Sequence, residues 1–347
     1  MNSSTLFRDI HEQPNALARF LDAESANVQR IAAEINRCQP TYLTIAARGT
    51  SDNAATFAKY VFASFNGLPV ALATPSLYSI YHTPPRLTDS LVIAISQSGE
   101  SPDILAVVEE AKRQQTLTLA VTNSAESRLA RAADMVILQH AGEEKTIAAT
   151  KTYTTQLAAL ALLSITLADD SARRRELEAV PAAVAGALSL DSPVEQAAAR
   201  LREMHTCLVI GRGYNYTTAF EIALKLKELA YVIAEPFSSA DFMHGPFALI
   251  QGGFPVIVIA PRGRVCDDLI AVSSQLKNRS ADLIVISDSP DALALADSPL
   301  VLPVSQPEWL SPLTAVVPGQ LLAYHLTTAK GFDPDHPRGL TKVTRTL

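Results

Sequence analysis

Two short segments rich in hydroxyl groups have the composition of an anion-binding site. They are Arg48-Gly49-Thr50-Ser51 and Ser96-Gln97-Ser98-Gly99-Glu100-Ser101, and both contain glycine. Exposed backbone N–H groups at a helix N-terminus, together with nearby hydroxyl donors, bind phosphate. Serine and threonine also cap helices, which is the alternative interpretation of either turn alone. Two such turns, with five hydroxyl groups between them, favour a phosphate site.

A second group of side chains could do acid–base or covalent chemistry. Lys225 and Glu228 lie three residues apart and share a face of a predicted helix. His244 precedes Gly245-Pro246, and Lys342 lies close to the C-terminus. A surface ion pair, a structural histidine and a solvated terminal lysine explain the same residues, so spacing alone leaves these roles open.

The elements that would carry these residues occur twice in the chain. Gly49 recurs as Gly213, an offset of 164 residues (213 − 49), and Asn123 corresponds to Asp288 at an offset of 165 (288 − 123). The matched segments are 44–49 with 208–213, 91–95 with 255–259, 119–123 with 284–288, 135–138 with 300–303, and 156–157 with 320–321. A nearly constant offset across these segments predicts an internal duplication.

The matched runs are rich in valine and isoleucine, as expected for strands that are buried on both faces of a parallel sheet. Stretches of helical spacing lie between them, and alternating strands and helices predict right-handed βαβ units. The expected fold is α/β, with two tandem doubly wound parallel-sheet domains of the flavodoxin-like type. We expect an N-terminal helical arm at 1–24, a first domain with the phosphate site at 25–170, a second domain with the catalytic helix and histidine at 190–335, and a tail over the active site at 336–347.

Ligands of open parallel sheets bind beyond the carboxyl ends of the strands. Both hydroxyl-rich turns follow predicted strands of the first repeat. The equivalent turns of the second repeat, Gly211-Arg212-Gly213-Tyr214 and Ala260-Pro261-Arg262-Gly263, lack the hydroxyl cluster. The phosphate is therefore expected in the first repeat.

Composition and motifs narrow the class of protein. The 347 residues are 48% hydrophobic and carry a net charge of −6, and no run rich in lysine or arginine suggests nucleic acid as a ligand. No P-loop motif is present and no GxGxxG motif follows a strand, which disfavours ATP and nicotinamide. Three scattered cysteines disfavour a disulfide framework and a thiolate metal site. With neither a signal segment nor an apolar run of bilayer length, we expect a cytoplasmic protein without metal, cofactor or membrane association.

Several motifs follow one another along almost the whole chain. They are Ile10-His11-Glu12-Gln13-Pro14, Gly49-Thr50-Ser51, Ser96-Gln97-Ser98-Gly99-Glu100, Ala149-Thr150-Lys151, Ala223-Leu224-Lys225-Leu226-Lys227-Glu228, His244-Gly245-Pro246 and Pro337-Arg338-Gly339-Leu340-Thr341-Lys342. In this order and spacing the chain resembles the sugar isomerase (SIS) family. Within the family it is most similar to the isomerase half of glucosamine-6-phosphate synthase and to the free-standing aminosugar-phosphate deaminases.

The resemblance implies a role for each matching position. Glu228 would shuttle a proton between C1 and C2 of the sugar, with Lys225 beside it. His244 would open the sugar ring, reaching in from the neighbouring subunit of a homodimer with shared active sites, and Lys342 would form a Schiff base with a ketose. The implied substrate- and phosphate-binding positions are Gly49, Thr50, Ser51, Ser96, Gln97, Ser98, Ser101, Ile147, Ala149 and Thr341.

Five positions depart from the pattern of a synthase. Ala149 stands in place of serine, Ala240-Asp241 in place of Gly-Glu, Met243 in place of lysine, and Arg48 in place of a small residue beside the expected phosphate. These departures indicate a pocket that differs from that of a strict synthase. Residue 2 is asparagine rather than a catalytic cysteine, and the repeats begin by about residue 42, so we expect no glutaminase domain.

The expected function is therefore an aminosugar-phosphate isomerase and deaminase. It would convert glucosamine 6-phosphate, or a close amino-sugar 6-phosphate, to fructose 6-phosphate and ammonia. A fructosamine-6-phosphate deglycase and an aldose–ketose phosphate isomerase are alternatives that no residue discriminates. A sugar-phosphate sensor without catalysis is the alternative from a different class, and the joint presence of Glu228, His244 and Lys342 favours an enzyme over it.

Overall fold

The computed structural model describes residues 4–342, which form two compact units. The N-repeat unit consists of Asn15–Glu144, Lys151–Ala179 and 341–342. The C-repeat unit consists of 4–14, Lys145–Thr150 and Val180–Leu340. The short segments 4–14 and Lys145–Thr150 thus group with the second repeat, although they precede or interrupt the first.

The N-repeat unit is built on a parallel sheet of five strands in the order β2-β1-β3-β4-β5. The strands are β1 (Tyr42–Ala46), β2 (Val70–Leu72), β3 (Ser90–Ile95), β4 (Thr118–Thr122) and β5 (Met135–Leu138). Every residue of β3 and β4 is buried, as expected for strands that are covered on both faces.

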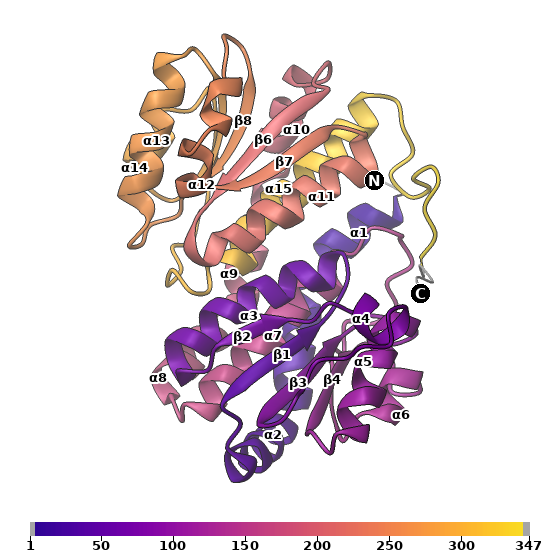
Figure 1. Cartoon of the computed structure of the whole chain (residues 1–347). Helices are drawn as coiled ribbons and strands as arrows, with labels where there is room; N and C mark the ends of the chain where they lie inside the picture. The colour runs from indigo at the N-terminus through magenta and orange to yellow at the C-terminus, as the bar shows by residue number, and fades with distance from the viewer. Residues whose placement is uncertain (1–3, 343–347) are drawn as a thin grey trace. The chain divides into compact units, whose positions relative to one another are not determined.

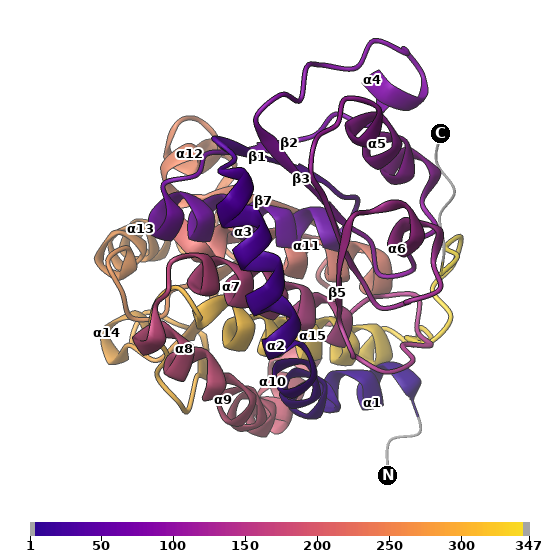
Figure 2. The same cartoon turned by 90° about the horizontal axis from the view of Figure 1, so that it is seen from below.

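Helices cover both faces of this sheet. They are α2 (Gln13–Cys38), α3 (Thr50–Asn66), α4 (Ser76–Ser79), α5 (Pro102–Arg113), α6 (Arg128–Ala132), α7 (Lys151–Leu167) and α8 (Ser171–Glu178). Both views show α3 and α7 on one side of the strands and α5 and α6 on the other (Figures 1 and 2).

The C-repeat unit repeats the same strand order. Its five parallel strands run β10-β9-β8-β6-β7, so that in both sheets the first strand lies between the second and the third. The strands are β6 (Thr206–Gly211), β7 (Ile233–Ser238), β8 (Pro255–Ile259), β9 (Asp282–Ser287) and β10 (Ser298–Val301). The predicted fold of two doubly wound parallel sheets is confirmed.

The helices of the C-repeat unit also lie on both sides of their sheet (Figure 1). They are α1 (Thr5–His11), α9 (Val180–Ala187), α10 (Asp191–Arg200), α11 (Tyr216–Ala230), α12 (Ser239–Met243), α13 (Cys266–Asn278), α14 (Pro290–Leu293) and α15 (Ser311–Ala329), with short 3-10 turns at Leu188–Leu190, Gly213–Asn215 and Pro246–Leu249. Helix α15 packs against α9, α10 and α11.

Helices α7 and α15 occupy equivalent places in the two repeats and are buried along most of their length. Their apolar residues are spread around the whole helix, which is the pattern of a helix buried on all sides. No helix within residues 4–342 is both long and hydrophobic enough to span a membrane.

Candidate active site

Both hydroxyl-rich turns lie at the carboxyl edge of the N-repeat sheet. Strand β1 ends at Ala46 and α3 begins at Thr50, while β3 ends at Ile95 and α5 begins at Pro102. Because β1 and β3 are hydrogen-bonded parallel neighbours, the two turns leave the same edge of the sheet at adjacent positions. Gly49 has a φ of +54°, a conformation that glycine adopts without steric cost.

Helix capping does not consume the hydroxyl groups of these turns. Gly49 is the N-cap of α3, and Ser101, the N-cap of α5, makes no capping hydrogen bond with its side chain. The Ser96 and Ser98 hydroxyls each accept a backbone N–H of their own turn, at 3.1 and 3.3 Å. A hydroxyl that accepts a hydrogen bond still has its own O–H to donate. The turns therefore keep the donors that an anion requires.

Two neighbouring contacts hold the first turn in place. The Ser51 hydroxyl accepts a hydrogen bond from Gln156 Nε2 of α7 at 3.0 Å. Arg48 Nε donates to Asp103 Oδ2 of α5 at 2.7 Å, and the Asp103 side chain is 0% exposed. The guanidinium that stands in place of a small residue is thus engaged by α5 and holds the two turns together.

A cavity of about 730 Å³ opens beside the second turn, within the N-repeat unit. Gln97 and Ser98 line one wall, and Asn123 and Ser124, which follow β4, line another. The Asn123 side chain also fixes the loop opposite, since it donates to the Gly142 carbonyl at 2.8 Å and accepts from a backbone N–H at 3.0 Å. The rest of the lining is Arg19, Asp22, Ala23, His140, Glu143 and Glu144.

Glu144 is a site residue that our sequence reasoning missed. Its carboxylate is 0% exposed and accepts from Lys342 Nζ at 3.1 Å and from the Thr152 hydroxyl at 2.7 Å. Thr152 lies in the first turn of α7, where the helix N-terminus also favours a negative charge. Lys342 is therefore held by a buried carboxylate rather than solvated as a free tail. A loop glutamate carries no periodic signal, and only its place between the Gly142 loop and the Ala149 motif could have drawn attention to it.

The predicted pair on α11 joins a buried lysine to a partly exposed glutamate. Lys225 Nζ lies 2.6 Å from Glu228 Oε2, and the Lys225 side chain is 1% exposed whereas that of Glu228 is 24% exposed. The interpretation as a surface ion pair is therefore wrong for the lysine. A buried carboxylate at i − 4, Glu221, lies on the other side of Lys225 at 3.4 Å and is a further residue that sequence reasoning missed.

His244 lies on an exposed turn of the C-repeat unit, directly after α12. Phe242, which is fully buried, anchors this turn, while Met243 is 38% exposed. Within residues 4–342 the His244 imidazole makes no hydrogen bond or ion pair, and the structure does not join it to the Lys225–Glu228 pair.

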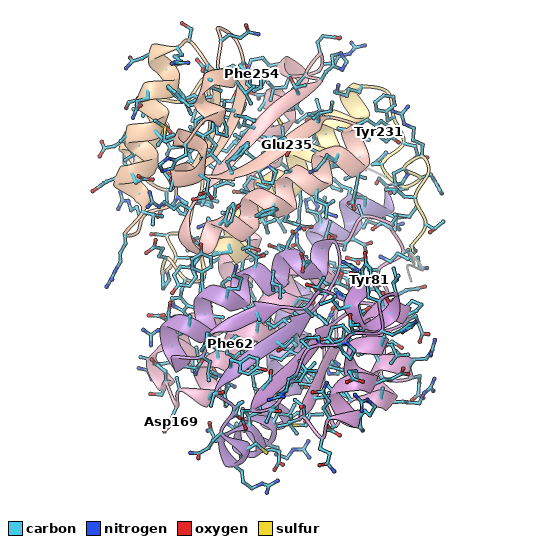
Figure 3. The ribbon with its side chains drawn as sticks, viewed as in Figure 1. Phe62, Tyr81, Asp169, Tyr231, Glu235 and Phe254 are labelled. Carbon is cyan, nitrogen blue, oxygen red and sulfur yellow. The ribbon has the colours of Figure 1, made fainter. Side chains whose placement is uncertain are left out.

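The segment that leads to the tail is anchored at the end of α11. The Arg338 guanidinium lies 3.8 Å from the centre of the Tyr231 ring, and the Arg338 N–H donates to the Tyr231 hydroxyl at 2.9 Å. Tyr231, which Figure 3 labels, is the C-cap of α11. Of the other predicted contact positions, Ile147 and Ala149 lie half-buried in the Lys145–Thr150 segment and Thr341 is exposed.

No group of histidine, cysteine, aspartate or glutamate side chains within residues 4–342 has the arrangement of a metal site. The candidate catalytic and binding groups of the described chain are hydroxyls, carboxylates, amines and an imidazole. Groups of these types can perform acid–base chemistry and can form a Schiff base.

Comparison with known proteins gives the family. The SIS domain model matches residues 38–166 and 200–330, once in each repeat. The isomerizing glutamine–fructose-6-phosphate aminotransferase of Thermococcus kodakarensis is 38% identical over 97% of this chain. This chain belongs to the SIS family. It spans 57% of the length of that relative.

Solved structures share the fold along nearly the whole chain. A putative phosphosugar isomerase from Silicibacter pomeroyi superposes with a TM-score of 0.86 at 34% identity, covering 96% of this chain and 100% of that one. The C-terminal domain of glucosamine-fructose-6-phosphate aminotransferase from Francisella tularensis gives 0.87 at 30% identity, with 97% and 99% covered. Glucosamine-6-phosphate deaminase from Thermotoga maritima gives 0.82 at 22% identity, with 99% and 100% covered, and shares the fold.

Proposed function

We propose that this chain is an aminosugar-phosphate isomerase and deaminase that acts in the cytoplasm as a homodimer. Its reaction would be glucosamine 6-phosphate, or a close amino-sugar 6-phosphate, plus water to fructose 6-phosphate and ammonia. The observation that carries the proposal is the Lys225–Glu228 pair, in which the lysine is 1% exposed and the carboxylate 24% exposed. A carboxylate fixed beside a buried cation suits proton transfer at a carbon next to a carbonyl or imine.

Phosphate binding would orient the substrate. The hydroxyls of Thr50, Ser51, Ser96, Ser98 and Ser101, with the amide of Gln97, would take the phosphate, whose distance from C1 and C2 makes it a handle rather than a reacting group. Helices α3 and α5 begin at these turns and add the positive ends of their dipoles.

The chemistry would then proceed by proton movements. His244 of the partner subunit would open the ring by moving a proton from the C1 hydroxyl to the ring oxygen. Glu228 would take the C2 proton while the aldehyde oxygen at C1 gains a proton, which gives the enolamine. Return of the C2 proton to C1, with loss of a proton from the amino group, would leave a ketose imine, a C1 hydroxymethyl group and the Glu228 carboxylate. Water would add to C2 of that imine, and cleavage of the C2–N bond would release ammonia and the ketose. Once it is released from Glu144, Lys342 would condense with the ketose carbonyl with loss of water, and hydrolysis of that Schiff base would return the free ketose and the lysine amine.

Incubation of the full chain with glucosamine 6-phosphate tests the proposal. We expect ammonia and fructose 6-phosphate in equal amounts, and neither with Glu228→Gln. Glu235→Gln is the matched control, because Glu235 is an exposed carboxylate on the neighbouring strand β7 (Figure 3). Interconversion of glucose 6-phosphate and fructose 6-phosphate without ammonia release would instead indicate an isomerase. Cleavage of a fructosamine 6-phosphate would indicate a deglycase, and saturable binding without turnover would indicate a sensor.

A mixing experiment tests the shared active site. His244→Ala and Glu228→Ala are each expected to be inactive. After unfolding and refolding together, about a quarter of the sites should regain both groups if each site draws His244 from the partner. No recovery, with both variants folded, would contradict the shared site.

A further inference from the structure

Lys225 is flanked by two carboxylates on the same helix. Glu228 Oε2 lies 2.6 Å from its Nζ on one side, and Glu221 Oε1 lies 3.4 Å away on the other. The Glu221 and Lys225 side chains are 0% and 1% exposed. The spacing of i − 4 and i + 3 places all three groups on one face of α11.

A buried lysine needs a compensating negative charge. Removing the partner of a buried ammonium group strongly destabilises the folded protein, because the charge then has neither water nor an anion beside it. In the proposed reaction Glu228 takes a proton from the sugar and becomes neutral for the lifetime of the intermediate. During that time Glu221 still supplies a negative charge to Lys225, and its own protonation does not change.

The elements that pack against α11 are α15, β6, β7 and the turn at Gly213–Asn215. Among the titratable side chains on these elements, His325 of α15 has its own partner, Asp191, at 2.7 Å, and Glu235 of β7 faces solvent. Burial raises the pKa of the Cys207 thiol of β6 to about 12, so this group stays neutral. The remaining groups on these elements are the phenols of Tyr214 and Tyr324.

We propose that Glu221 is a positioning residue for the proton transfer, which keeps Lys225 charged and in place while Glu228 is protonated. The inference rests on the proposed function of Glu228 as the base. Within that step the C2 proton moves to Glu228 and then to C1, and one proton passes from the substrate amino group to the C1 oxygen, while Glu221 keeps its charge and Lys225 its proton. Without Glu221, neutralising Glu228 would remove the charge of both carboxylates that lie within 3.4 Å of Lys225 Nζ.

The test is Glu221→Gln, which removes the charge and keeps the size of the side chain. Lys225 would then depend on the Glu228 carboxylate and resist its protonation. We expect kcat to fall roughly 10- to 100-fold with KM within about twofold, since the weaker base slows the transfer. The acidic limb of the kcat/KM profile should move to lower pH by about one unit. Glu221→Asp, which keeps the charge, should hold the limb at its wild-type position.

Asp191→Asn is the matched control, because it removes a carboxylate that binds a buried side chain elsewhere in the C-repeat unit, His325 at 2.7 Å. It should leave the acidic limb unmoved. If the wild-type protein is active on the sugar phosphate and Glu221→Gln keeps the acidic limb of its kcat/KM profile at the wild-type pH, this inference is overturned and the proposed function stands. A wild-type protein that turns over no sugar phosphate, and exchanges no C2 proton with solvent, would instead overturn the function.

A folding defect of Glu221→Gln is also informative when Lys225→Met is added to it. The double variant has no buried cation to compensate. If it folds where the single variant does not, Glu221 is the charge partner of Lys225, as proposed. If both fail to fold, Glu221 acts through packing and the inference is wrong.

Discussion

The N-repeat and C-repeat units share an arginine–aspartate ion pair at equivalent positions. In each unit this pair joins the end of the first strand to the start of a helix, and we call it the joint. Arg48 binds Asp103 in one, and Arg212 binds Asp268 in the other, both at 2.7 Å. The arginines are 164 residues apart (212 − 48) and the aspartates 165 (268 − 103). In each unit the arginine follows the first strand of the repeat and the aspartate opens the helix after its third.

A second support is also duplicated. Asp134 accepts the Thr118 N–H at 3.0 Å and pairs with Lys112 at 3.1 Å. Its counterpart Asp297 accepts the Leu283 N–H and pairs with Lys277, both at 2.8 Å. Each aspartate ties a strand to the preceding helix and to the start of the next strand.

The units differ at the edges that these supports hold. The N-repeat edge presents serine and threonine, whereas α11 of the C-repeat unit carries a buried lysine between two glutamates. The ion pairs that join strands to helices are therefore the same in both repeats, while the candidate ligand-binding residues differ. Each of the following variants changes a residue of one unit, and the other unit serves as the reference.

The largest expected effect comes from Glu228, the proposed base in the C-repeat unit. Glu228→Gln removes the proposed base and should lower kcat by about 10²- to 10⁴-fold. Binding of the sugar phosphate, measured by calorimetry, should stay within a few-fold of wild type because the proposed phosphate contacts come from residues of the N-repeat unit. A comparable loss of binding would contradict the division of roles between the units.

The next effect compares the two arginine–aspartate joints. Asp103 is fully buried, so Asp103→Asn should lower the free energy of unfolding by about 2–4 kcal/mol. The Asp268 side chain is 40% exposed, and Asp268→Asn should cost only about 1 kcal/mol or less. Urea denaturation of both variants measures the difference. Equal losses would show that burial does not set the strength of this joint.

A smaller effect, on KM, is expected from the turn at 96–101, which is proposed to bind the phosphate. Ser98→Ala removes one hydroxyl donor to a charged ligand, a contact of about 1.5–3 kcal/mol. We expect KM for the sugar phosphate to rise about 10- to 100-fold with little change in kcat. Arg262 occupies the equivalent turn of the C-repeat unit, and Arg262→Ala is the control that should leave KM unchanged.

The smallest effect is a dependence on pH. Burial acts to raise the pKa values of Asp134 and Asp297, but the hydrogen bonds from their lysine and backbone partners outweigh it and hold both pKa values below the ordinary range. Such groups stabilise the fold above the pKa of the unfolded chain, about 3.9, and lose this contribution as the pH falls through the folded value.

Asp134→Asn and Asp297→Asn should therefore each lower the free energy of unfolding by about 1 kcal/mol at pH 7. The deficit relative to wild type should begin to shrink below about pH 5 and should disappear only as the pH falls through the lowered folded pKa values. Thermal denaturation across this pH range provides the measurement. A deficit that stays constant with pH would assign the effect to packing instead of charge.

The fold could be predicted from the sequence because its signals are periodic. Buried runs such as those of β3 and β8 repeat at a constant offset, and a parallel sheet requires such runs. The spacing of Lys225 and Glu228 also predicted their shared face. The burial of the lysine could not be predicted, since it depends on packing from β6, β7 and α15.

Residues in loops were harder to predict. Glu144 lies 198 positions from Lys342 in the sequence, and neither residue shows a pattern that points to the other. The grouping of Lys145–Thr150 with the C-repeat unit was invisible for the same reason. The Thr146 hydroxyl reaches Asp9 Oδ2 at 3.0 Å, a contact between two segments that local propensity does not link.

The beginning of the described chain has a consequence for biosynthesis. The backbone N–H groups of Thr5 and Leu6 and the Ser4 hydroxyl all donate to the Asp335 carboxylate, so α1 takes its cap from a residue 331 positions beyond Ser4. A ribosome that adds about 5–20 residues per second makes Asp335 roughly 15–70 seconds after α1 has emerged. Helix α1 therefore lacks its contacts with the Asp335 carboxylate until residue 335 has been synthesised.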